Sequence, residues 1–370
     1  MHDVFSSVKN LLKIDTVNID NNVFRLHYKA TMFILVAFSV LVTQGQYFGD
    51  PIDCITTKMD SDIMDSYCWI HGTYLLPEHY HSEQPHPGLG PDNNSKKEDR
   101  DYHMYYQWVT LFLYLQAAMF YLPRYLWKTQ EGNKMEQLVQ DLDAPIVDDE
   151  VKDKKKETLT DYFRTNFHKH DFYAYKFFGC EILNFINVVG QMFFVNRFLG
   201  YEFTTYGTRV LNYSNMDGQI QRSDPMYLMF PRVTKCHMRP YGVSGSTEVH
   251  DALCVLPLNV IKEKISIFLW FWFIIVAVVT GLALIYRGLC FLPQFRNLVF
   301  SVRCKIVDGN ALDSITRKCK IGDWLILYQL SKNMDPLIFK EFISELAVKL
   351  PDVPIDPSAP PTAAYGTIHK

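Results

Sequence analysis

The sequence predicts an all-α membrane protein whose subunit has four transmembrane helices, disulfide-linked external loops and a helical cytoplasmic layer. Three observations predict this fold: four apolar segments of about twenty residues, a pair of cysteines in each of two long connecting segments, and helical apolar spacing in the polar regions. Average composition hides it, because a mean hydropathy of -0.06 and 21% charged residues would also suit a soluble protein.

Four apolar segments have the length that crosses a hydrocarbon core of about 30 Å as a helix. They cover residues 28–48, 105–127, 177–199 and 265–286. Many of the 22 Tyr and 26 Phe residues lie at their edges, where amphipathic rings meet the membrane interface. The alternative is a buried helix of a soluble core, which fits the third segment best because that segment carries Glu181.

The topology follows from the amino-terminal residues 1–27, which contain no visible cleavable signal peptide. We therefore expect both termini in the cytosol, residues 49–104 and 200–264 outside the cell, and residues 128–176 and 287–350 inside it. Of the 37 Lys and Arg residues, 25 fall on the cytoplasmic side and 11 in the external loops, which is a modest bias of the expected sign.

Cysteine placement supports this topology independently. The first external loop contains Cys54 and Cys68, and the second contains Cys236 and Cys254. An even pair in each oxidising loop suits a disulfide framework, whereas the four cysteines in the membrane or cytosol should stay reduced.

Four cysteines allow three pairings, and their positions along the loops favour one of them. Cys54 and Cys254 each lie within about a dozen residues of a helix end, while Cys68 and Cys236 lie 37 residues from the far ends of their loops. Because bridged Cα atoms lie within about 7 Å, cysteines at equal heights above the membrane should pair. This favours Cys54 with Cys254 and Cys68 with Cys236.

Several motifs resemble a known family. The sequence YYQWV, which is Tyr105, Tyr106, Gln107, Trp108 and Val109, resembles the signature of the innexins, the invertebrate gap-junction proteins. Further similar segments are GDPIDC at 49–54, YLPRYLWK at 121–128, FPRVTKC at 230–236, DALCVLPLN at 251–259 and IGDWLILYQLSKNMDPLIFKE at 321–341. The resemblance covers nearly the whole chain and is strongest to insect innexins of the innexin two type; innexins carried by wasp viruses are similar too.

The resemblance implies a structural subunit of gap junctions in the plasma membrane, forming intercellular channels and hemichannels that pass ions and small molecules. It further implies an octameric ring around a pore, homo-oligomeric or hetero-oligomeric with other innexins, that docks with a second ring on the neighbouring cell. The alternative is a pannexin-like non-junctional large-pore channel. Membrane lipid is an expected partner, and no enzymatic activity, cofactor, metal or nucleic acid is expected.

Candidate pore-lining residues fall in three places. By the resemblance, the amino-terminal segment with Val4, Phe5 and Val8 folds into the pore; taken alone, it would be an interfacial amphipathic helix. In the first transmembrane helix, the polar side chains form one stripe, which faces either the pore or a neighbouring helix. These side chains are Ser39, Thr43 and Gln46.

The third candidate is a pair of carboxylates, Asp50 and Asp53, directly after the first helix. Repeated around a ring, they would favour cations. The alternative is that either carboxylate forms a turn near Pro51.

The other transmembrane helices also carry expectations. A stripe of Glu181, Asn184, Asn187 and Gln191 in the third helix predicts a polar seam between helices rather than a pore face, and the fourth helix, apolar on every side, should face lipid. Pro123 predicts a bend in the second helix, the alternative being that it marks the helix end.

Other features have plain interpretations. His79, His81 and His86 are close in sequence, but their Pro- and Gly-rich surroundings argue against a metal site. Asn93 and Asn212 begin N-x-S sequons in the external loops and are glycosylation candidates. Residues 351–370 are expected to be a disordered tail.

Competing classes lack their signatures. The chain has no large external amino-terminal domain as in pentameric ligand-gated channels, and no Cys-Cys-Gly motif as in tetraspanins. It also shows no nucleophile with a base and no Gly-rich phosphate loop.

Overall fold

The computed structural model describes residues 17–57, 59–80, 86–91, 100–140, 142, 149–200, 202–214 and 224–350. These residues form two units, which we describe separately. The bundle unit contains Asp20–Trp127 and Cys180–Leu284, and the helical unit contains Lys128–Gly179 and the residues from Ile285 onward. The predictions for Val4, Phe5, Val8, His81, Asn93 and the tail 351–370 lie outside the described residues.

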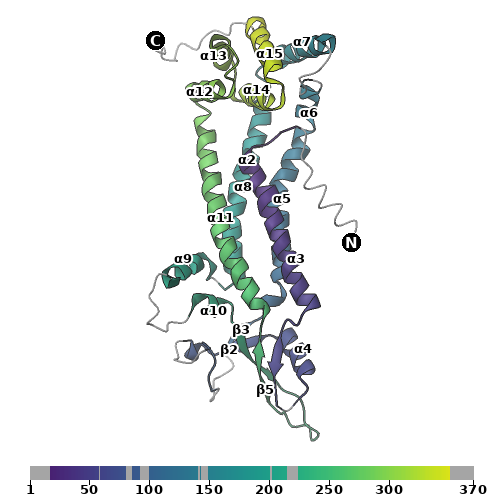
Figure 1. Cartoon of the computed structure of the whole chain (residues 1–370), viewed down its shortest axis with the longest axis vertical. Helices are drawn as coiled ribbons and strands as arrows, with labels where there is room; N and C mark the ends of the chain where they lie inside the picture. The colour runs from purple at the N-terminus through teal and green to yellow at the C-terminus, as the bar shows by residue number, and fades with distance from the viewer. Residues whose placement is uncertain are drawn as a thin grey trace. The chain divides into compact units, whose positions relative to one another are not determined.

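Four long helices run side by side in the bundle unit (Figure 1). The first consists of α2 (Asn22–Arg25), a π-helical segment (Leu26–Thr31) and α3 (Met32–Phe48). The others are α5 (Val109–Glu131), α8 (Asp171–Phe198) and α11 (Leu258–Leu289), whose ends extend into the helical unit. Each of the last three continues beyond its apolar segment at one or both ends, because backbone hydrogen bonding carries on into the polar flanks.

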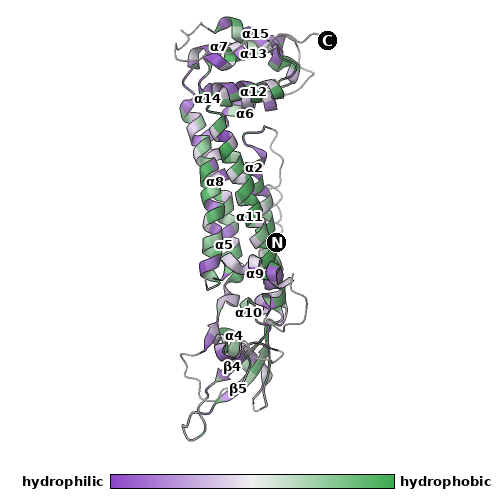
Figure 2. Ribbon diagram, turned by 90° about the vertical axis from the view of Figure 1, so that its left-hand side faces the viewer, coloured by the Kyte–Doolittle hydropathy of each residue, from purple (hydrophilic) through white to green (hydrophobic). Residues whose placement is uncertain are grey.

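Three described helices are long and apolar enough to cross a membrane: Asn22–Phe48, Asp171–Phe198 and Leu258–Leu289. The fourth long helix, α5, is less apolar, since several tyrosines, Gln116 and Arg124 interrupt its hydrophobic residues. Both Gln116 and Arg124 are buried, so these polar groups lie inside the bundle unit. Figure 2 shows that hydrophobic residues predominate along α11.

The core of the bundle unit is built from the facing sides of these helices. Buried members include Leu35 of α3, Phe120 of α5, Val188 of α8 and Phe273 of α11, and the rings of Phe120 and Phe273 stack with centroids 5.7 Å apart. The prediction that the fourth helix faces lipid can therefore apply to only part of its surface, and for that part it stays a prediction. One side of α11 packs into this core, while its other side exposes Ile275, Leu282 and other apolar residues.

An antiparallel sheet, which the all-α prediction did not include, connects the two external loops. Its strands are β1 (Asp53–Ile55), β2 (Thr73–Leu75), β3 (Asp101–His103), β4 (Val233–Met238) and β5 (His250–Val255), in the order β1-β5-β4-β2-β3. The two central strands, β5 and β4, come from the second loop, and the flanking strands come from the first. Three of the strands have three residues each, which is too short for an alternating pattern to be recognised in the sequence.

Short helices complete the external part of the bundle unit. In the first loop, α4 (Ser61–His71) follows β1, and single 3-10 turns cover Pro77–His79 and Tyr105–Gln107. In the second loop, α9 (Phe203–Ser214) packs against the bundle core, and α10 (Pro225–Met229) precedes β4. The tight contact of α9 depends on Gly207, where an added Cβ would lie 2.2 Å from the ring of Trp270.

Pro123 lies inside α5, which continues to Glu131. The alternative that this proline marks the helix end is therefore wrong. The bend remains a prediction, because proline removes one backbone hydrogen bond and crowds the preceding turn.

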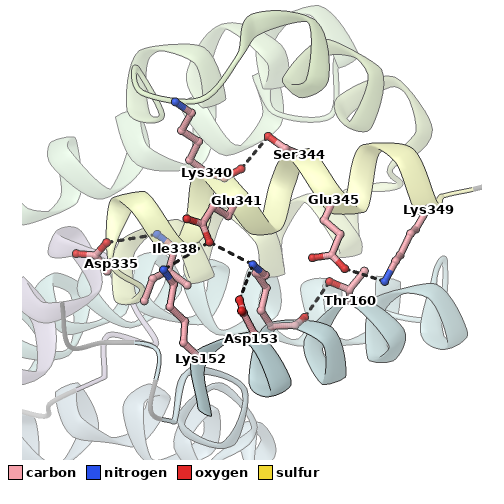
Figure 3. A network of polar contacts seen from close by, with 11 residues as sticks. Lys152, Asp153, Thr160, Asp335, Ile338, Lys340, Glu341, Ser344, Glu345 and Lys349 are labelled. Carbon is pink, nitrogen blue, oxygen red and sulfur yellow. Dashed lines mark hydrogen bonds and ion pairs between the residues drawn. The ribbon is translucent and has the colours of Figure 1, made fainter. Parts of the chain in front are cut away.

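The helical unit contains α6 (Lys134–Val139), α7 (Asp149–Asn166), α12 (Pro293–Arg303), α13 (Gly309–Lys318), α14 (Ile321–Asn333) and α15 (Pro336–Lys349). As the apolar spacing predicted, Trp324, Leu325 and Leu327 of α14 are buried in it. Charged side chains of α7 and α15 meet across its surface, where Lys152 lies 3.5 Å from Glu341 (Figure 3).

Candidate functional site

Two disulfides join the external loops to each other. They connect Cys54 with Cys254 and Cys68 with Cys236, which is the pairing favoured by the positions of these residues along the loops. Cys54 and Cys254 face each other on the neighbouring strands β1 and β5, whereas Cys68 lies on α4 and Cys236 on β4. Each bridge therefore ties a first-loop element to a central strand of the sheet.

The two bridges are neighbours rather than well separated along the loops. The sulfurs of Cys54, Cys68 and Cys254 lie within 4.8 Å of one another, and both bridges belong to a small core with Met64 and Leu256. Because these sulfurs are oxidised, they offer no thiolate to a metal. Their close packing makes them a single cross-linked centre of the external sheet.

The YYQWV motif connects the start of α5 to this cross-linked centre through hydrogen bonds and a ring contact. The hydroxyl of Tyr106 donates to the carbonyl of Cys68 at 3.2 Å, and the amide of Gln107 donates to the carbonyl of Trp69. The ring of Tyr106 also packs on that of Trp69, with centroids 4.7 Å apart, and the Tyr105 hydroxyl donates to the carbonyl of Met229 at 3.2 Å. The motif is thus a joint between a membrane-spanning helix and both external loops, a role that the sequence alone did not reveal.

Asp50 and Asp53 are both exposed at the outer end of α3. Neither carboxylate makes a hydrogen bond to another described residue, so the turn-forming alternative gains no support. Further carboxylates lie nearby: Asp60 caps α4 by accepting from the backbone of Asp62, and Asp65 accepts from the backbone N–H of Cys54 at 2.6 Å. Burial raises the pKa of Asp65, the Cys54 hydrogen bond opposes this, and the charges of Asp53, Asp62 and Asp50 raise the pKa further. The region is strongly acidic.

Ser39, in the polar stripe of α3, faces α5 rather than open space. Ser39 is 2% exposed, and its hydroxyl donates to the carbonyl of Thr110 at 3.2 Å. The hydroxyl of Thr110 in turn donates to Gln46 at 3.2 Å. The pore-facing prediction is therefore wrong for Ser39, because its short polar side chain is satisfied by a neighbouring helix. Thr43 and Gln46 are half-buried and remain candidates.

The third-helix stripe forms contacts between helices, as predicted. Gln191 accepts from the amide of Gln116 at 3.1 Å, and Glu181 accepts from the amide of Asn21 at 2.6 Å. Glu181, Asn184 and Gln191 are all buried. The stripe therefore joins α8 to α5 and to the residues before α2.

A buried ion cluster connects the residues around α2 to α5, and sequence reasoning missed it. The carboxylate of Asp20 lies 3.0 Å from Arg124 and 2.8 Å from Arg25, and it accepts from the hydroxyl of Tyr28 at 2.8 Å. The side chains of Asp20 and Arg124 are 1% and 5% exposed. Arg124 was the available signal, since a cation inside an apolar segment requires a partner.

The remaining candidates lie apart from these groups. Asn212 is exposed in the last turn of α9, which suits an acceptor for glycosylation and leaves that assignment a prediction. Of the histidines, His86 lies near Tyr227, with ring centroids 6.2 Å apart.

These features define a class: a multi-pass membrane protein whose apolar helices carry a disulfide-linked sheet outside the bilayer. The innexin family model matches residues 20–350. The chain is 52% identical to Innexin inx2 of Schistocerca americana over 355 residues, covering 95% of this chain and 98% of that protein. It is also 52% identical to Innexin inx2 of Drosophila melanogaster (94% and 95% covered) and 46% identical to Innexin shaking-B of the same species (95% of each covered).

The chain therefore belongs to the innexin family, and it is a plasma-membrane subunit of gap-junction channels rather than an enzyme. The family also implies that the subunit works in an oligomeric channel assembly.

Proposed function

We propose that this subunit forms an octameric ring around a pore and that two rings on neighbouring cells dock through the external sheet. The observation that carries the docking step is that strands from both loops are cross-linked into one sheet beyond the ends of the membrane-spanning helices. A cross-linked sheet holds its loops in one conformation before contact, which reduces the entropy lost on binding.

The hairpin between β4 and β5 has the exposed apolar groups that docking requires. Tyr241 is 80% exposed and Val249 is 54% exposed, and Val243 lies fully exposed between them. Apolar side chains at the tip of a rigid hairpin suit association with another protein surface. In this proposal, the hairpin tips of one ring contact the external surface of the opposing ring.

The proposed pore wall includes Val4, Phe5 and Val8 of the amino-terminal segment, with Thr43 and Gln46 of α3 along its length. At the external mouth, Asp50 and Asp53 would form a repeated band of negative charge. Such a band attracts cations and repels anions.

Paired expressing cells test docking separately from pore formation. We expect Val243→Asp to remove current between paired cells, because it places a charge in an apolar contact, while leaving single-membrane currents of normal size. Val348→Asp, at a position in the helical unit that is 86% exposed, is the matched control and should leave both currents intact.

Loss of both currents in Val243→Asp would indicate a folding defect rather than lost docking. Normal coupling between cells would contradict the docking role of the hairpin. If the unsubstituted chain conducts in single membranes but never between paired cells, the pannexin-like alternative holds.

A further inference from the structure

The helix α12 has two faces, and one of them packs against the rest of the helical unit. The ring of Phe300 contacts that of Phe339 in α15, with centroids 6.2 Å apart. The guanidinium of Arg296 donates to the carbonyl of Cys319 at 3.1 Å. Both Phe300 and Arg296 are buried. These contacts fix the rotation of α12 about its own axis.

The opposite face of α12 is an apolar stripe formed by Phe295, Leu298 and Val302. These residues follow one another at intervals of three and four positions, so their side chains lie on one side of the helix. Phe295 is half-buried, whereas Leu298 is 58% exposed and Val302 is 63% exposed. A helix that is held by one face and exposes an apolar stripe on the other has a surface suited to a second hydrophobic environment.

The apolar stripe of α12 comes directly after a membrane-spanning helix. α11 is long and apolar enough to cross a membrane, and it ends at Leu289. Since each helical residue advances the chain by about 1.5 Å, α11 extends only about 4.5 Å past Tyr286, the last residue of its apolar segment. Leu289, Phe291 and Leu292, which lead from α11 to α12, are exposed as well. Exposed apolar residues therefore continue from the end of the membrane-spanning helix to the stripe.

Two exposed cations lie at the far end of the stripe. Arg303 is the last residue of α12, and Lys305 follows shortly after it. Neither contacts a carboxylate among the described residues, whereas Arg317 of α13 pairs with Asp313 at 2.8 Å. An apolar helix face bordered by Lys and Arg is typical of segments that lie in the plane of a membrane interface, where the cations meet anionic headgroups.

We propose that α12 lies in the interface of the cytoplasmic leaflet, with its apolar stripe among the acyl chains and with Arg303 and Lys305 against the phosphates of anionic lipids. The competing occupant of the stripe is a second copy of this chain. Lipid is favoured because the stripe continues from a membrane-spanning helix and because both cations lack a carboxylate partner among the described residues. Such a contact ties the helical unit to the bilayer in addition to α11.

Quenching by brominated lipid tests the position of the stripe in the purified full-length channel in nanodiscs. A bimane label on the Leu298→Cys variant should be quenched by brominated phosphatidylcholine at least threefold more strongly than a label on Val348→Cys. Val348 is 86% exposed on α15 and is the matched control site. Labelling of the unsubstituted channel measures the background from the buried free thiols.

The role of the cations is tested with the same label on Leu298→Cys. Brominated phosphatidylserine should quench it more strongly than brominated phosphatidylcholine at equal mole fraction, because Arg303 and Lys305 enrich the anionic lipid. The double change Arg303→Gln with Lys305→Gln should remove this difference. The double change Lys154→Gln with Lys340→Gln, at two exposed lysines elsewhere in the helical unit, is the control and should retain it.

Equal quenching at the Leu298 and Val348 sites would overturn the membrane contact. A Leu298 label that is shielded from both brominated lipid and aqueous iodide would also overturn it and would assign the stripe to an interface between copies of the chain. Equal quenching by the two brominated lipids in the channel that keeps Arg303 and Lys305 would refute the selection of anionic lipid. Size-exclusion chromatography and unreduced peptide mapping verify that every variant keeps the assembly and both disulfides.

Discussion

At the residue scale, the Asp20 carboxylate is the centre of a buried ion cluster in the bundle unit. It is buried, and two arginines and a tyrosine hydroxyl contact it. Such a cluster holds the chain before α2 against α5. Its charges stabilise the fold only while they remain together.

The single change Asp20→Asn should therefore destabilise the protein by about 3–5 kcal/mol, because it removes the buried carboxylate that contacts Arg124 and Arg25. The double change Asp20→Asn with Arg124→Met removes both charges and should recover much of this loss. Thermal unfolding of the purified channel compares the two variants. Equal melting temperatures for the single and double variants would show that the ion pair is not the cause.

The acidic mouth gives a second prediction for individual residues. Replacing Asp50 and Asp53 together by Asn keeps their shape and removes their charge, so single-membrane currents under a salt gradient should show reduced preference for cations. Asp251→Asn, an exposed carboxylate on β5, is the control. An unchanged reversal potential with currents of normal size would exclude a role of this pair in selectivity.

At the scale of elements, apolar packing and surface charge both connect α7 to α15, but with unequal strength. Phe163 of α7 and Phe342 of α15 are fully buried, with ring centroids 5.7 Å apart. On the surface beside them, Lys156 contacts Asp153 at 3.1 Å and Glu341 at 3.2 Å. Burial of aromatic rings contributes more than partly solvated ion pairs do.

Phe342→Ala should thus cost about 3–5 kcal/mol and Lys156→Ala at most about 1 kcal/mol, the latter decreasing with added salt. Limited proteolysis of the helical unit in the intact channel would report the difference. Comparable sensitivity of the two variants would contradict this ranking.

The bend predicted at Pro123 also belongs to this scale. Pro123→Ala restores a backbone donor inside α5, so the helix should straighten. Spin labels at Thr110 and Lys128, on either side of the proline, measure the change as a longer distance. An identical distance distribution in both proteins would show that α5 is already straight.

At the scale of the whole molecule, the external sheet depends on two loops that are far apart in sequence. The disulfides close separations of 200 and 168 residues. Loss of such a bridge commonly costs about 2–5 kcal/mol. A substitution that disrupts the structure of one loop should therefore also disrupt the structure of the other loop.

Cys68→Ser should accordingly abolish channel current while the protein is still synthesised, whereas Cys180→Ser, a free buried thiol, should be tolerated. Mass spectrometry of unreduced peptides should find fragments of the two loops joined. A fragment with Cys54 bonded to Cys68 would contradict the structure.

The sequence by itself determined the helical membrane class and favoured the disulfide pairing. Apolar length and cysteine placement are local properties, which a single chain displays without knowledge of its fold. The family resemblance at Tyr105–Gln107 and the following Trp108 and Val109 likewise rests on contiguous residues, and the comparisons confirm it.

Only the tertiary structure decided which polar groups meet. Short strands such as Asp53–Ile55 form because they pair with strands of the other loop. No local sequence pattern therefore predicts this sheet. The same holds for Ser39 with Thr110 and for Asp20 with Arg124. Helical periodicity tells which side chains share a face of one helix, but the contacts between helices depend on how those faces pack together.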